Sequence, residues 1–305
     1  MPAPHWSSVT ALLVLFAAAP IVPGMATRTK AIFAGRRGAP VWQLYADLLK
    51  LARRGIVYST TATWVLRLAP IVLLATTMTA ATLLPLDGQS ALVRFAGDAV
   101  AFAYLLALGR FVLVLSALDT GSSFEGMGAS RDVTFASFVE PGIFLAFAAL
   151  ALAAHDLSLT AMLGSPAARI TVGAPALLPI AASMFALALA ECSRVPVDDP
   201  ATHLELTMVH EVVVLDASGP DLAMIAYANA LKMALFAAIT LDLLWPAPHP
   251  AGLTGIALLA GTLAAFGIAV GIVESVMARL RLPRVPLYIA GASAMALFGL
   301  ILLLR

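Results

Sequence analysis

The segment 191–220 combines many titratable side chains with apolar runs on both sides. Its six acids, one arginine and two histidines are Glu191, Asp198, Asp199, Glu205, Glu211, Asp216, Arg194, His203 and His210. The flanking runs at 172–190 and 222–245 are each long enough to cross a bilayer, which takes about 20 residues. Carboxylates at the end of a membrane helix are costly, and they are rare unless they carry protons, carry ions or bind a partner. Proton transfer or partner binding is the chemistry that this segment indicates.

Charged residues also occur inside the apolar runs, where each one costs about 2.5–3.5 kcal/mol on insertion scales. Glu140 is expected in the first turns of its span, and Lys232 in the middle of its own. Burial disfavours the charged form of a carboxyl group and of an amine, so both groups can exchange protons near neutral pH. Together with Glu191 and Glu205, these residues predict a polar, partly hydrated path for protons.

The other charges within the runs have a structural interpretation beside the functional one. Arg94 and Asp98 are four residues apart, which is the spacing of an ion pair on one face of a helix. Arg67 can extend its charged end toward the membrane surface. Arg110 also lies within a span, and Asp242 is expected near the outer membrane surface.

Several classes of site are excluded by the sequence. His203 and His210 are seven residues apart, whereas a metal-binding pair on a helix needs a spacing of about three or four, so no metal site is predicted. The single cysteine excludes a disulfide framework and any CxxC site. Because enzyme motifs such as HExxH and GxSxG are absent, no catalytic residue is predicted. The net charge of +1, with no basic stripe, gives no indication of a nucleic-acid partner.

The composition is that of a polytopic membrane protein. The chain is 61% hydrophobic and 11% charged, whereas a soluble domain has about 25% charged residues. We predict an all-α fold that forms a single integral membrane domain over 1–305, with about eight transmembrane helices. Their expected ranges are 7–25, 62–84, 91–117, 133–155, 172–190, 222–245, 252–277 and 284–304. The first range lacks a preceding basic segment, which argues against a cleaved signal peptide.

The lysines and arginines between the spans predict the orientation. Twelve fall in connections on one side of the membrane and two on the other. Because basic connections stay in the cytoplasm, we expect a multi-pass protein of the inner (plasma) membrane with both termini outside. The cytoplasmic connections are then 26–61, 116–132 and 191–221.

Two further helices are expected outside the spans. One, at about 40–54, carries apolar residues on one face and charges on the others, which is typical of a helix lying along the membrane interface. The other, at about 200–217, begins at Asp199-Pro200 and ends at Ser218-Gly219-Pro220. Because it has one polar and one apolar face, it should pack on the membrane bundle or on a soluble subunit.

Four stretches of the chain together resemble a known family. They are GRRGAPVWQLYADLLKL, GASRDVTFASFVEPG, AECSRVPVDDP and MARLRLPRVP. In this order they are similar to the membrane-arm subunit shared by respiratory complex I, where it is subunit 1, and the group 4 [NiFe] hydrogenases. The run PVDDPATHLELTMVHE more closely resembles the branch of formate hydrogenlyase subunit 4 and hydrogenase-4 component C, because Ala201 and His203 replace two acids of the complex I branch.

The resemblance implies a membrane anchor and proton-coupling subunit, which links cytoplasmic electron transfer to ion translocation. The residues expected along the proton path are Glu140, Glu191, Asp198, Glu205, Asp216 and Lys232. The residues expected to dock cytoplasmic partners are Arg36, Arg37, Arg194, His210 and Glu211.

The resemblance also implies partners and leaves two alternatives. The expected partners are hydrogenase large and small subunits and iron–sulfur proteins on the cytoplasmic face, with antiporter-like subunits in the lipid bilayer. Iron–sulfur clusters and the [NiFe] centre are expected on those subunits, and no cofactor on this chain. One alternative is the quinone-binding subunit 1 of an NADH:quinone oxidoreductase (complex I), with quinone entering near the first span and the interface helix. The other is a stand-alone ion antiporter or transporter.

Overall fold

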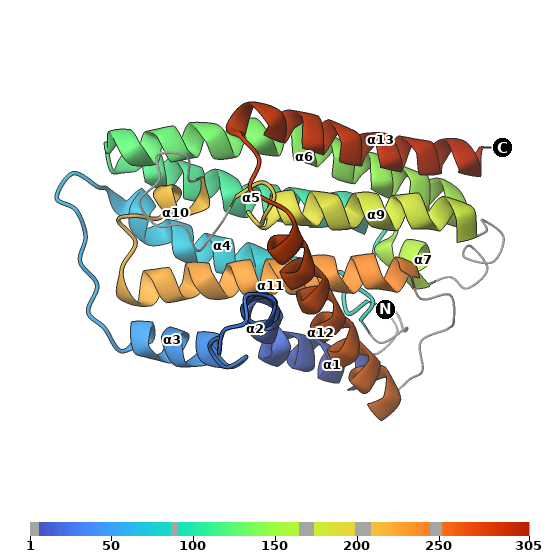
Figure 1. The fold of residues 1–305 in the computed structure, drawn as a ribbon, viewed down its shortest axis with the longest axis horizontal. Coiled ribbons are helices and arrows are strands. Elements are labelled where there is room, and N and C mark those ends of the chain that lie inside the picture. The colour runs from blue at the N-terminus through green and yellow to red at the C-terminus, as the bar shows by residue number, and fades with distance from the viewer. Residues whose placement is uncertain (1–5, 87–90, 165–173, 199–208, 245–251, 305) are drawn as a thin grey trace.

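A computed structural model describes the chain except for residues 1–5, 87–90, 165–173, 199–208, 245–251 and 305, and its described part is helical without strands. The helices are α1 (Trp6–Ala18), α2 (Ile21–Phe33), α3 (Gln43–Ala52), α4 (Trp64–Thr82), α5 (Asp98–Asp119), α6 (Ser123–Ala154), α7 (Leu159–Gly164), α9 (Ala174–Glu191), α10 (His210–Val213), α11 (Gly219–Leu244), α12 (Leu253–Val276) and α13 (Val285–Leu303), with a short 3-10 turn, η1 (Leu282–Arg284), before α13. Most of the long helices run side by side along the longest axis of the molecule, and α12 crosses them (Figure 1).

The apolar helices account for the predicted spans. By length and composition, six of those described can cross a membrane: α4, α5, α6, α11, α12 and α13 with its leading turn. The pair α1 and α2, bent by 43°, makes a seventh span if it is counted as one, and the apolar part of α9, Pro175–Glu191, is shorter. The all-α membrane fold is therefore confirmed, and the count of about eight is approximate.

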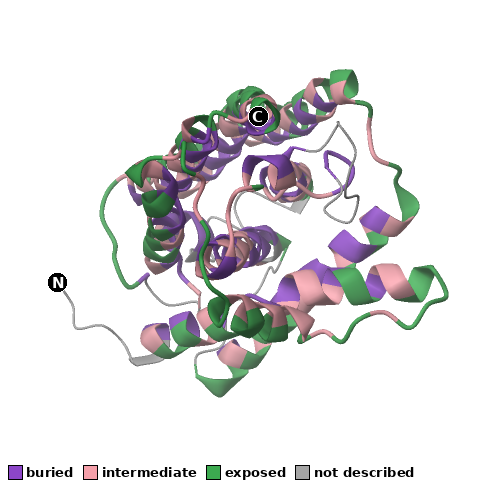
Figure 2. Cartoon of the chain, turned by 90° about the vertical axis from the view of Figure 1, so that its left-hand side faces the viewer, coloured by how far each residue is buried: buried purple, intermediate pink, exposed green. Residues whose placement is uncertain are grey.

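Helix α11 lies at the centre of the bundle. About 61% of its most apolar stretch is buried inside the protein, against 28–44% for the other five long spans. Seen along the long axis, the buried faces of the helices turn inward, and the exposed faces form the rim (Figure 2). A charge on α11 therefore has to find its partners within the chain.

The fourth span is longer than the sequence predicts. Helix α6 begins at Ser123, within the predicted connection 116–132, and α5 continues to Asp119, so the connection is reduced to three residues. Gly121, at a φ of +70°, makes this tight turn in a conformation that residues with a side chain rarely adopt. As a result Glu140 lies in the middle of a 32-residue helix rather than in its first turns.

The helix predicted at about 200–217 is not continuous in its described part. Residues 199–208, with the expected helix start at Asp199-Pro200, lie outside the described residues. Beyond them, only His210–Val213 is helical. Two buried carboxylates explain the short helix. The Asp198 carboxylate accepts hydrogen bonds from the backbone amides of Val209 and His210, at 3.1 and 3.2 Å. The Glu125 carboxylate accepts a hydrogen bond from the backbone amide of Asp216 at 3.0 Å. These bonds turn the chain away from the helical path.

The predicted pair of Arg94 and Asp98 does not form. Asp98 is the first residue of α5, so Arg94 precedes the helix and the two side chains do not share a helical face. The Asp98 carboxylate instead accepts hydrogen bonds from the Ser158 hydroxyl (3.0 Å) and the Leu159 amide (2.6 Å), next to the start of α7. Arg94 lies 3.9 Å from a carboxylate oxygen of Asp156.

Helix α3 is the short amphipathic helix predicted at about 40–54. It has no fully buried residue, and the side chains of Trp42 and Leu49 are exposed. The Tyr45 hydroxyl donates a hydrogen bond to the backbone oxygen of Ala17, which ties α3 to the first span. An attached helix with exposed apolar side chains suits the position at the membrane interface that the sequence predicts.

Helix α2 is held tightly against α12 by glycines. A Cβ at Gly267 would lie 2.6 Å from the Val22 backbone oxygen, and one at Gly271 would lie 2.5 Å from the Thr29 Cβ. This close approach places Lys30 on α2 within 3.9 Å of Glu274 on α12.

Candidate functional site

The centre of the candidate site is Arg110 on α5, whose side chain is only 12% exposed. Each nitrogen of its guanidinium group faces a different carboxylate. Nε lies 3.7 Å from Asp132 Oδ2, and Nη1 lies 3.6 Å from Glu140 Oε1, both on α6. Nη2 is in direct contact with Oε1 of Glu191, the last residue of α9. One side chain thus links three helices.

Glu191 also has a second cation beside it. Lys232 of α11 places its Nζ 3.5 Å from the same Oε1 atom. A buried ion needs partners because its desolvation costs several kcal/mol, and Glu191, with a side chain only 5% exposed, has two. Its other oxygen, Oε2, is buried and accepts no hydrogen bond from any described residue. This atom is where a proton can bind.

Counted over the residues that the structure describes, the network has one carboxylate more than it has cations. Asp132, Glu140 and Glu191 face Arg110 and Lys232. An uncompensated charge in a poorly hydrated interior is expensive, and such a group takes up a proton instead. Together these five side chains are therefore suited to hold one exchangeable proton.

Three cavities adjoin Glu191. The largest, of about 340 Å³, lies between α2, α3, α10, α11 and the end of α9. Its lining mixes apolar residues such as Leu44 and Ile225 with Arg194, His210 and Lys232. Two smaller ones, of about 20 and 10 Å³, lie on the Arg110 side of the network. Glu191 lines all three, so it stands between the large cavity and the interior of the bundle.

Cys192 also lines the large cavity. Burial raises the pKa of its thiol to about 11. The thiol is therefore neutral at physiological pH, which makes it a poor nucleophile.

A second ionic group surrounds the turn after α9. The Asp198 carboxylate, besides its two backbone donors, accepts a hydrogen bond from Arg279 at 2.8 Å. Arg194 lies 3.4 Å from Glu274, which also faces Lys30 at 3.9 Å. Asp198, predicted on the proton path, is thus held in a hydrogen-bonded position, and Arg194, predicted to dock a partner, pairs with a carboxylate of its own chain.

His210 lies between these two groups. Its Nε2 is 2.6 Å from the side-chain nitrogen of Asn229 on α11. Burial lowers the pKa of His210 below its usual value of 6.5, and the positive charge of Lys232 acts in the same direction, against the nearby acids Asp132 and Asp198. The ring is therefore neutral at pH 7 and acts as a hydrogen-bonding group.

Glu125, near the start of α6, is a buried carboxylate that lies outside both ionic groups. Its carboxylate accepts hydrogen bonds from the Thr120 hydroxyl and the backbone amide of Asp216. Asp216 thus contributes its amide to this site. A cavity of about 10 Å³ adjoins Glu125, Asp216 and Asp221.

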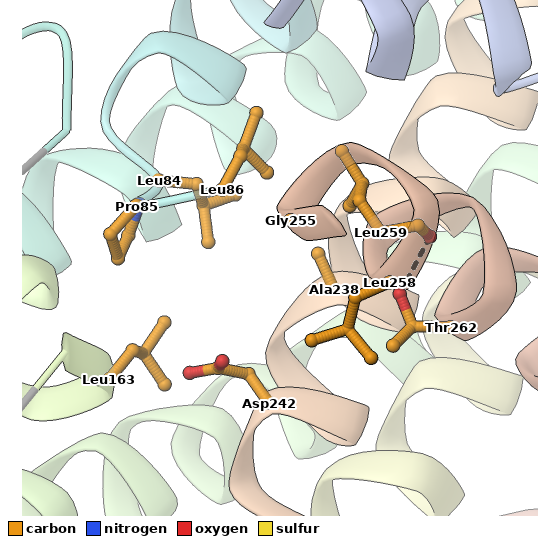
Figure 3. Close-up of a pocket in the computed structure, with 10 residues that line it drawn as sticks. All are labelled: Leu84, Pro85, Leu86, Leu163, Ala238, Asp242, Gly255, Leu258, Leu259 and Thr262. Atoms are coloured by element: carbon orange, nitrogen blue, oxygen red, sulfur yellow. Dashed lines mark hydrogen bonds between the residues drawn. The ribbon is translucent and has the colours of Figure 1, made fainter. Parts of the chain in front are cut away.

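At the opposite end of α11, Asp242 lines a cavity of about 30 Å³. Figure 3 shows its carboxylate turned toward a space bordered by Leu163 and the side chains of α12. The Thr262 hydroxyl in that wall donates its hydrogen bond to the Leu259 backbone oxygen, at 2.7 Å. Since about 30 Å³ is the share of one water molecule in the liquid, this cavity is small.

The structure brings three predicted path residues together, namely Glu140, Glu191 and Lys232. Asp198 lines the small cavity that Arg110 and Glu191 share, Asp216 lies beside Glu125, and Glu205 lies outside the described residues. Of the predicted docking residues, Arg36 and Arg37 are exposed after α2, and Glu211 is partly exposed next to His210.

Sequence reasoning did not identify the roles of Arg110, Asp132, Glu125 and Glu274. Arg110 was visible as a charge inside a span, which is the signal that could have found it. Asp132 and Glu125 fall within the predicted connection 116–132, which indicates exposed rather than buried side chains.

A family model described as NADH dehydrogenase matches residues 7–304. Hydrogenase-4 component C of Escherichia coli K12 is 32% identical over 234 residues, which covers 77% of this chain and 73% of that protein. Formate hydrogenlyase subunit 4 of the same organism is 31% identical over 284 residues and 90% of each chain. Among solved structures, a chain of the membrane-bound sulfane sulfur reductase, an archaeal respiratory membrane complex, is similar with a TM-score of 0.82 over 97% of this chain and 98% of that one. At 17% identity, that likeness shows the fold alone.

Proposed function

Because the chain belongs to the NADH dehydrogenase subunit 1 family, we propose that it is the membrane anchor and proton-coupling subunit of a group 4 hydrogenase-like complex. The relatives named hydrogenase-4 component C and formate hydrogenlyase subunit 4 support that branch. The observation that carries the coupling role is the network around Arg110, in which three described carboxylates, with Glu191 buried among them, face two cations. A purely structural ion pair needs no surplus carboxylate.

Electron transfer takes place in partner subunits that dock at the end of the molecule where α10 lies, which the sequence places in the cytoplasm. Those subunits hold the iron–sulfur clusters and the [NiFe] centre. A change of charge there alters the proton affinity of Glu191, which lies next to the large cavity. Glu140 and Lys232 pass the change toward antiporter-like subunits in the inner membrane.

The first experiment separates proton coupling from assembly. Glu191→Gln, Glu140→Gln and Glu205→Gln are introduced one at a time into the intact complex in proteoliposomes, and protons translocated per electron are measured. Asp47→Asn on α3 is the control, since that carboxylate accepts a hydrogen bond from Gln43 and lies outside the network. Each glutamine variant should assemble, keep electron transfer when uncoupled and lose most of the translocation. Unchanged translocation in all three would refute the coupling role.

A second function, quinone binding, is favoured by one observation. The large cavity reaches Pro23 of α2 and Leu44 of α3, which is near the place where the resemblance to complex I implies that quinone enters. Ala226→Phe on α11 would fill part of that cavity. If quinone is the electron acceptor, the purified complex contains quinone, and this variant raises the KM for quinone. If the complex is hydrogenase-like, hydrogen turnover continues in quinone-depleted membranes.

A further inference from the structure

Arg110 occupies a position that the proposed function leaves without a role. It contacts both Glu191 and Glu140, which lie on different helices. It also lines both small cavities on its side of the network. A residue between two proposed proton carriers can control how they exchange protons.

The two carboxylates differ in their surroundings. Glu191 is buried and touches two cations, whereas the Glu140 side chain is 42% exposed and has the weaker, 3.6 Å contact with Arg110. In the resting arrangement two carboxylates balance the two cations, and the third must carry a proton if the group is to be neutral. Asp132 and Glu140 each face only Arg110, at 3.7 and 3.6 Å. Of these two acids, Glu140 lies in the middle of the α6 span, where an ionised carboxylate is most costly, so Glu140 is the acid that carries the proton.

We infer that Arg110 is a positioning residue that couples Glu191 and Glu140 in opposite phase, so that a proton taken up by one releases a proton from the other. This inference rests on the proposed coupling function. A hydronium ion in the large cavity, which Glu191 lines, gives one proton to the Glu191 carboxylate and becomes water. As the new O–H bond forms, the attraction between Glu191 and Arg110 weakens. The guanidinium group then pairs with Glu140.

The charges balance in both arrangements. As Arg110 pairs with Glu140, the O–H bond of Glu140 breaks, and its proton leaves to water or to a basic group of an adjoining membrane subunit. Before and after, two cations face two ionised carboxylates and one neutral carboxyl group. Because a net charge in a low-dielectric interior is costly, an exchange that keeps the cluster neutral has a lower barrier than one that adds a charge.

The guanidinium group suits this role better than an ammonium group. Its planar fork presents several N–H donors in fixed directions, so it can hold two carboxylates at once. Arg110→Lys keeps the charge and loses the fork, and Arg110→Gln loses the charge as well. Arg67→Lys on α4 is the matched control, because Arg67 lies over the Tyr58 ring outside the network.

The test is redox-induced infrared difference spectroscopy on the intact complex, with carboxyl bands assigned through Glu140→Gln and Glu191→Gln. In the wild type the two carboxyl bands should change with opposite sign. In Arg110→Lys, which should assemble, the opposite-sign pair should disappear, and protons translocated per electron should fall by about tenfold. Arg67→Lys should leave both readouts unchanged.

Two results separate this inference from the proposed function. If the opposite-sign bands persist in Arg110→Lys, the positioning role of Arg110 is refuted, and the proposed function stands as long as the glutamine variants lose translocation. If translocation survives Glu191→Gln, Glu140→Gln and Glu205→Gln, the proposed function itself is refuted. If Arg110→Gln does not assemble, the Arg110→Lys result decides alone.

Discussion

At the scale of single residues, the two ionic groups around Arg110 and Arg194 pair each cation with a carboxylate, and the described part of the Arg110 network has one carboxylate in surplus. Glu191 shares Oε1 between Arg110 and Lys232, and Glu274 lies between Lys30 and Arg194. Breaking a buried pair by removing one partner costs about 3–5 kcal/mol, so these contacts fix the ends of α9 and α12 in place. The surplus carboxylate is what distinguishes the Arg110 network from a structural one.

His210 gives a pH-dependent prediction at this scale. Its pKa in the folded protein lies below 6.5, so the unfolded chain binds a proton more readily than the folded one. The stability that this group contributes is therefore present above about pH 6.5 and is lost as the pH falls through the lowered pKa. In detergent, the melting temperature of His210→Gln should fall less between pH 7 and pH 5 than that of the wild type. An equal fall in both proteins would contradict the lowered pKa.

At the scale of elements, the sequence predicts the existence of the helices better than their ends. Long apolar runs have few folding options in a bilayer, because every backbone group must be hydrogen-bonded within the helix. The ends depend on tertiary contacts: the amide of Asp216 goes to Glu125, and α6 starts at Ser123 rather than near 133. For the same reason, the sequence indicates that Glu140 and Lys232 are candidate residues but not that Glu140 contacts Arg110 and Lys232 contacts Glu191. No spacing along the chain relates side chains on different helices.

The contact between α2 and α12 gives a prediction about packing. In Gly271→Ala, the added Cβ would lie 2.5 Å from the Thr29 Cβ and 2.6 Å from the Ala26 backbone oxygen, both on α2. The two helices must separate, which should destabilise the protein by about 1–3 kcal/mol and weaken the contact of Lys30 with Glu274. Gly261→Ala on the same helix meets no atom within 4 Å, so it should be neutral or slightly stabilising. Melting temperatures in detergent compare the two, and an equal effect would contradict the close packing.

At the scale of the whole molecule, exposed basic side chains lie in the loop after α2, within a connection that the sequence predicts to be cytoplasmic. The loop after α2 carries Arg36 and Arg37, both exposed. Between exposed charges, electrostatic attraction is screened over about 10 Å at 0.1 M salt and about 3 Å at 1 M. If these arginines hold the module, its attachment depends on salt.

Replacing both arginines should therefore loosen the module. In Arg36→Gln/Arg37→Gln membranes, partner subunits should be released at a lower salt concentration than from wild-type membranes, as measured by blotting the washed fraction. Lys50→Gln on α3 is the control for a single lost positive charge. Identical release curves for the double variant and the wild type would show that these two residues do not contribute to docking.

The proposed coupling requires that carboxylates around Arg110 change their protonation during turnover, and infrared difference spectroscopy of the wild-type complex tests this most directly. We predict a carboxyl band that changes between the oxidised and reduced states and is lost in Glu191→Gln. A spectrum in which no carboxyl band changes over a full turnover would contradict the coupling role.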